Sequence, residues 1–118
     1  MVRRSITYPT LVLMSDENQI DIPASFTALF VLPGRQKPSQ PRHVVGVRYE
    51  LCEDMATMLT ETARSMLFSL GISEHEILVR IYRGLTGEGS VVKVPEAKWV
   101  MQRLAELLEW DIDLTLLS

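Results

Sequence analysis

The longest helical pattern of this 118-residue chain lies in residues 44–70, VVGVRYELCEDMATMLTETARSMLFSL. Its apolar members recur at helical spacings and spread over more than half of a helical circumference. They are Leu51, Cys52, Met55, Ala56, Met58, Leu59, Ala63, Met66, Leu67 and Leu70. We therefore expect a central helix over 44–70, with several neighbours packed against it and a left-handed residue at Gly71 that ends it.

Two helices are predicted after this one. The segment Ser73-Glu74-His75-Glu76 has the form of a capping box and predicts a helix over about 74–85, with Glu76 and Arg80 as an i, i+4 pair. Pro95 suits the first turn of a helix over about 95–110, which carries an aliphatic stripe. The glycines at 84, 87 and 89 indicate a turn-forming connector between the two helices.

The pattern before residue 44 is shorter and more mixed. Residues 11–22 combine two apolar runs with a polar turn and predict a β-hairpin. Pro23 and the apolar residues after it predict a short helix over about 23–32. Residues 34–43 hold two prolines and no acid and predict a loop or extended arm, here called the basic loop.

The tail alternates polar and apolar residues over 111–117, which predicts a strand that could join the hairpin. These elements predict a mainly α fold, a compact bundle of about four helices with a small antiparallel sheet; an α+β fold is the alternative. No repeat or flexible linker divides the chain, so residues 1–118 are expected to form a single domain.

Composition excludes several classes of protein. Charged residues make up 23% of the chain and apolar residues 47%, which excludes disorder of the whole chain. The single cysteine, Cys52, rules out an internal disulfide framework and a zinc site of several thiolates, and is expected to be a buried apolar residue. No run is apolar enough to span a membrane, and Tyr8, Pro9 and Thr10 interrupt the only stretch that resembles a secretory signal. We expect a cytoplasmic protein.

Charge is divided unevenly along the chain. Residues 1–49 carry six bases and three acids, whereas residues 50–118 carry six bases and twelve acids. No acid lies between Asp21 and Glu50, and Arg35, Lys37 and Arg42 fall in that interval. Two interpretations stay open: the basic loop covers acidic helices of its own chain, or it binds an acidic partner or a phosphate.

Both tryptophans lie on the otherwise polar side of the last predicted helix. At about 100° per residue, Trp99, Arg103, Glu106 and Trp110 fall within about 60° of one another, opposite the aliphatic stripe. Tryptophan is enriched at interface anchors, so we expect this face to be covered. The cover is either the hairpin or tail of the same chain, or a second copy or another protein.

Carboxylates and glycines offer weak signals for an enzyme. Glu50, Glu53 and Asp54 share one helical turn and could bind a divalent cation, but neither histidine completes a helical metal motif, so a solvated acidic face is the better interpretation. The glycine-rich run 84–90 lacks the lysine of a phosphate-binding loop, and no nucleophile–base motif is present. No cofactor, catalytic residue or small-molecule substrate is predicted.

DNA binding is the alternative class. Residues 65–83 read as helix, turn and helix, and Arg80 and Arg83 could contact phosphates. The second helix, however, begins with two glutamates, which repel phosphates. The net charge of −3 also disfavours a nucleic-acid partner.

Two strings, IPASFTALF at 22–30 and RYELCED at 48–54, resemble a group of small proteobacterial proteins, some of which carry the label "ATPase with chaperone activity". The resemblance implies a bacterial cytosolic protein and transfers no catalytic residues. The ATPase label itself has no motif here to support it.

The sequence therefore predicts a non-enzymatic protein-interaction or adaptor domain that forms a homo-oligomer or binds another protein. Its expected contact residues are Trp99, Arg103 and Trp110 on the last helix and Arg35, Lys37 and Arg42 on the basic loop. A DNA-binding regulator is the first alternative, and a metal-dependent enzyme is the second.

Overall fold

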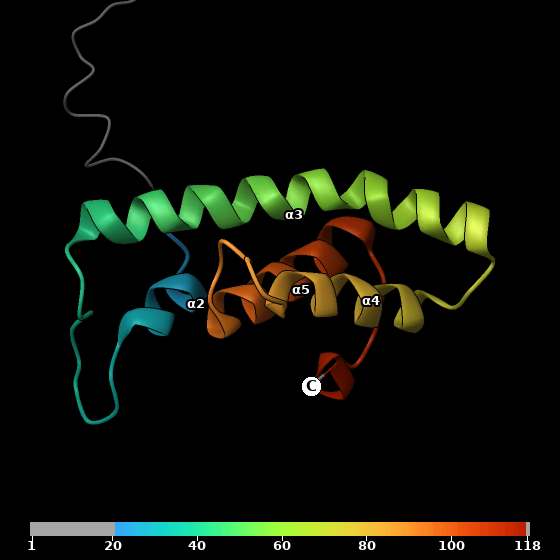
Figure 1. The fold of residues 1–118 in the computed structure, drawn as a ribbon. Helices are drawn as coiled ribbons and strands as arrows, with labels where there is room; N and C mark the ends of the chain where they lie inside the picture. The colour runs from blue at the N-terminus through green and yellow to red at the C-terminus, as the bar shows by residue number, and fades with distance from the viewer. Residues whose placement is uncertain (1–20, 118) are drawn as a thin grey trace, which may run out of the picture. The chain divides into compact units, whose positions relative to one another are not determined.

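The computed structural model describes residues 21–117 as a succession of helices (Figure 1). Their order is α2 (Ala24–Thr27), η2 (Ala28–Phe30), α3 (Arg42–Leu70), α4 (Glu74–Thr86), α5 (Val94–Leu108) and η3 (Leu114–Leu117), where η marks a 3-10 helix. Contacts divide the chain into two units, Met1–Arg48 and Tyr49–Ser118, and the boundary falls inside α3. Each unit is described by itself.

The first described element of the first unit is a short helical segment. Pro23 precedes α2, and its carbonyl accepts hydrogen bonds from the backbone N–H groups of Phe26 and Thr27. Phe26 is buried, and its ring lies 5.6 Å from that of Phe30. The predicted helix over 23–32 is present, but it tightens into η2 and ends at Phe30.

The chain between Phe30 and α3 is a closed turn and not an extended arm. Arg35 N–H donates to the Leu32 carbonyl across Pro33 and Gly34, and Gly34 has a φ of 80°. Proline followed by glycine at these two positions is typical of a type II turn. A bridge between Val31 and Pro38 and a 2.7 Å hydrogen bond from Ser39 N–H to the Phe30 carbonyl hold the two sides of the loop together.

Helix α3 starts at Arg42, two residues earlier than predicted, because the Pro41 carbonyl already accepts from the N–H groups of Val44 and Val45. It ends as predicted before Gly71, which has a φ of 65°. Several of the apolar residues on which the expected neighbours of this helix were based are exposed. Its buried positions in the second unit are the small residues Cys52, Ala56 and Ala63, whereas Met58, Leu67, Phe68 and Leu70 are exposed.

Helices α4 and α5 pack against each other and lie along one side of the second part of α3 (Figure 1). Ser73 caps α4 as predicted, since its hydroxyl accepts from Glu76 N–H at 3.1 Å. Lys93 N–H donates to the buried Glu96 carboxylate at the start of α5, with Pro95 in the first turn. The core of this unit is apolar, with Ile77, Leu78, Val100, Met101 and Leu104 fully buried.

The predicted strand over 111–117 is wrong. Leu114–Leu117 form η3, which packs against α4, and residues 21–117 contain no strand with which the tail could pair. Of the predicted hairpin, residues 11–20 lie outside the described part, and Asp21 and Ile22 are not in a strand. The fold is mainly helical, and the predicted sheet is not supported.

Helix α3 is long, but length alone does not suit a helix to a bilayer. None of the helices within residues 21–117 combines the length and the apolar character that a membrane crossing requires.

Candidate functional site

Trp99 lies in the contact between α3 and α5. Only 9% of its surface is exposed, and its ring meets that of Tyr49 edge to face, with centroids 5.8 Å apart. Edge-to-face contact is one of the two preferred arrangements of a pair of aromatic rings. Part of the cover of Trp99 is therefore Tyr49, a residue of α3 in its own unit.

Arg103 lies one turn further along α5 and faces Glu53, one turn along α3 from Tyr49. Arg103 Nε donates to Glu53 Oε1 at 2.9 Å and Nη2 donates to Oε2 at 3.1 Å. Nη1 donates to Glu106 Oε1 at 3.2 Å. The hydrogen bond to Glu53 raises the pKa of Arg103, against a smaller opposing effect of desolvation. Arg103 is thus a helix-to-helix link whose charge is matched inside the unit.

Trp110 does not continue the face of Trp99, because α5 ends at Leu108. Glu109 has a φ of 61°, in the left-handed region. Trp110 N–H donates to the Ala105 carbonyl and Glu109 N–H donates to the Glu106 carbonyl, which is the Schellman arrangement. The chain therefore turns before Trp110, and its side chain stays half-buried.

A shallow groove of about 520 Å³ lies between the end of α5 and η3. Trp110, Ala105, Ile112 and Leu114 give it an apolar part. Four carboxylates line it as well, those of Glu106, Glu109, Asp111 and Asp113, and no basic residue of the described part of the chain does. We call this the acidic groove. An aromatic ring among carboxylates suits a cationic side chain with an apolar stem.

Asp113 shapes one side of the acidic groove. Its Oδ1 accepts from Thr115 Oγ1 at 2.7 Å and from Thr115 N–H at 3.0 Å, and these bonds start η3. The hydroxyl bond, followed by the backbone bond, lowers the pKa of Asp113 below its ordinary 3.8. Two local hydrogen bonds thus replace the strand pairing that the alternating sequence suggested.

The candidate metal ligands are not gathered into a site. Glu53 is engaged by Arg103, while Glu50 and Asp54 are exposed. Within residues 21–117 no three His, Cys, Asp or Glu side chains are placed to hold a metal ion. Cys52 is buried, as expected.

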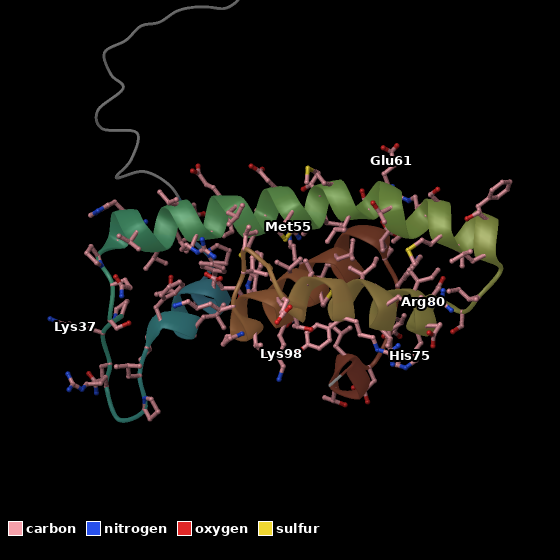
Figure 2. The ribbon with its side chains drawn as sticks, in the orientation of Figure 1. Lys37, Met55, Glu61, His75, Arg80 and Lys98 are labelled. Atoms are coloured by element: carbon pink, nitrogen blue, oxygen red, sulfur yellow. The ribbon has the colours of Figure 1, made fainter. Side chains whose placement is uncertain are left out.

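The candidate DNA contacts, Arg80 and Arg83, lie on exposed positions of α4. Arg80 Nε contacts Glu76 Oε2 at 3.2 Å, so the predicted i, i+4 pair is confirmed. His75 lies in the first turn of α4 and Arg80 at its middle, and both are labelled in Figure 2. Glutamates at 74 and 76 stand in the first turn of this helix, where they oppose an approaching phosphate.

The three basic contact residues that the sequence predicted, Arg35, Lys37 and Arg42, are divided between two elements. Arg35 and Lys37 are exposed on the closed turn, and Figure 2 shows Lys37 projecting from it. Arg42 instead forms the first residue of α3. We call Arg35 and Lys37, with the turn that carries them, the basic tip.

No protein-family model, curated protein or solved structure matches the chain. The site therefore rests on its own geometry. Sequence reasoning singled out Trp110 but missed the groove beside it, because the left-handed residue that creates the groove is a glutamate and not the usual glycine.

Proposed function

We propose that the chain is a non-enzymatic protein-interaction domain of the bacterial cytoplasm, which associates with itself or with another protein through the acidic groove. Of the contact residues expected on α5, Trp110 is the one that contributes, since Trp99 and Arg103 already serve the contact between helices. The single cysteine, buried in α3, suits a reducing compartment.

The observation that carries this proposal is the half-buried Trp110 in a groove of about 520 Å³. Tryptophan and arginine are enriched among the residues that dominate binding energy, and such anchors lie in pockets from which a partner can exclude water. The carboxylates around Trp110 add a polar rim that favours a positively charged partner surface.

The direct test replaces Trp110 by glutamate. We expect W110E to abolish association, measured by sedimentation at several protein concentrations, and to leave the helix content by circular dichroism unchanged. Loss of helix content in W110E would contradict the proposal, because it would make Trp110 a core residue.

Phe68 provides a matched control. It is an aromatic residue of α3 with 93% of its surface exposed, and it does not line the groove. F68E introduces the same charge at this different apolar position and is expected to leave association intact. If F68E abolishes association while W110E does not, the contact surface lies at the end of α3 and the proposal is wrong.

A further inference from the structure

We propose that the acidic groove binds the basic tip of a second copy of this chain. This inference rests on the proposed function, because it names the occupant of the same groove.

The groove calls for a cationic occupant. Its four carboxylates are drawn from the end of α5 and the tail that follows, and no lysine, arginine or histidine lines it within residues 21–117. Of the four, Glu106 alone contacts a cation, Arg103, among the ion pairs between described side chains. Glu109 and Asp111 are exposed. A lysine or arginine side chain laid on Trp110 would therefore meet carboxylates at its charged end.

The basic tip has the complementary chemistry. Arg35 and Lys37 are exposed, and no acidic residue lies between Asp21 and Glu50 to offset them locally. The turn at Pro33 and Gly34 and the bridge from Val31 to Pro38 fix the backbone that carries them. A fixed turn loses little conformational entropy on binding, so its two cations bind more strongly than they would on a flexible chain.

The acidic groove and the basic tip are both part of this one sequence, so a second copy of the chain carries a tip for each groove. For that reason we assign the occupant to a second copy. Each molecule can place its basic tip in the groove of a neighbour and bind a neighbour's tip in its own groove. This gives either a closed pair or a head-to-tail chain. Ion pairs at a surface are weak and screened by salt, so the association constant should fall about tenfold or more between low salt and 0.5 M salt.

The test exchanges the charges of the two partners in the full chain. R35E/K37E reverses the tip, and E109K/D111K reverses the groove without touching Asp113, which holds η3. Sedimentation at low salt should show wild-type assembly and a monomer for each double variant alone. An equimolar mixture of the two double variants, and the quadruple variant by itself, should assemble again.

Three results would overturn the assignment. Assembly that W110E abolishes but R35E/K37E does not would leave the proposed function standing and exclude the tip as the occupant. A monomeric wild type, together with a shift of the Trp110 emission of W99F when a lysine- and arginine-rich peptide is added, would assign the groove to another basic protein. Failure of the quadruple variant to assemble, with its helix content intact, would show that the charges of the basic tip are not paired with those of the acidic groove.

Discussion

The two tryptophans of this chain stand eleven residues apart and have different surroundings. Trp99, in the second turn of α5, is buried, and its ring meets that of Tyr49 of α3. Trp110, just beyond the end of the same helix, lines a groove of carboxylates. A helical wheel places both on one face only while the helix continues, and α5 stops between them at Leu108. The comparison shows that the end of a helix can separate a core residue from a surface residue of the same predicted face.

The largest expected effect is the difference between the two tryptophans in how much each contributes to the free energy of unfolding. W99A removes a buried ring and should lower the free energy of unfolding by about 3–5 kcal/mol. W110A removes a half-buried ring and should lower it by less than about 1.5 kcal/mol. Urea unfolding followed by circular dichroism measures both; equal losses would contradict the division between core and groove.

Breaking the ion pair between Arg103 and Glu53, which lies beside Trp99, should have a smaller effect on the free energy of unfolding. E53Q removes the charge that Arg103 meets while keeping the shape of the side chain. Because this pair is partly exposed, we expect a loss of about 1 kcal/mol. The loss of stability caused by E53Q should disappear when Arg103 has already been replaced in R103M. A double-mutant cycle of E53Q and R103M measures this coupling. Additive effects of the two substitutions would show that the pair contributes nothing.

Replacing Glu109, the left-handed residue between the two tryptophans, should increase stability. Glu109 adopts a φ of 61°, which favours glycine, and its negative charge stands at the negative end of a helix dipole. E109G should therefore raise the free energy of unfolding by about 0.5–1 kcal/mol. E109A, which keeps the strain and removes the charge, is the control. A loss of stability in E109G would mean that α5 does not end in a left-handed turn.

The smallest effect concerns the far side of the acidic groove. The hydrogen bonds from Thr115 lower the pKa of Asp113, so the folded turn favours the ionised carboxylate. The stabilisation it gives is fully present above the ordinary pKa of 3.8 and is lost as the pH falls through the lowered pKa. In T115V, the Asp113 pKa measured by NMR titration should rise toward 3.8. An unchanged pKa would show that the hydroxyl does not hold this turn.

Local signals predicted the helices of this fold well. Ser73 at a helix start and Gly71 at a helix end act within one turn of their own position, and both behave as expected. The end of α5 was not predictable in this way, because Glu109 adopts a conformation that its residue type disfavours. The strand predicted over residues 111–117 was wrong for a related reason. Alternation predicts a strand only where a partner strand exists, and the side chain of Asp113 satisfies the Thr115 N–H instead.

The candidate site was half predictable. Trp110 and the basic loop could be selected from residue type and charge. The part that Trp99 and Arg103 play in helix packing could not, because it depends on Tyr49 and Glu53, some fifty residues earlier in the chain. Pairings of that range are set by helix packing and leave no mark in the local pattern.

The most direct measurement follows each tryptophan alone. In W99F the only tryptophan is Trp110, and in W110F it is Trp99. Emission and acrylamide quenching are recorded as protein concentration rises through the range of assembly seen in sedimentation. We predict that Trp110 shifts to shorter wavelength and becomes protected from quenching, while Trp99 stays protected throughout. Assembly that leaves the Trp110 signal unchanged would contradict the assignment of the acidic groove as the contact surface.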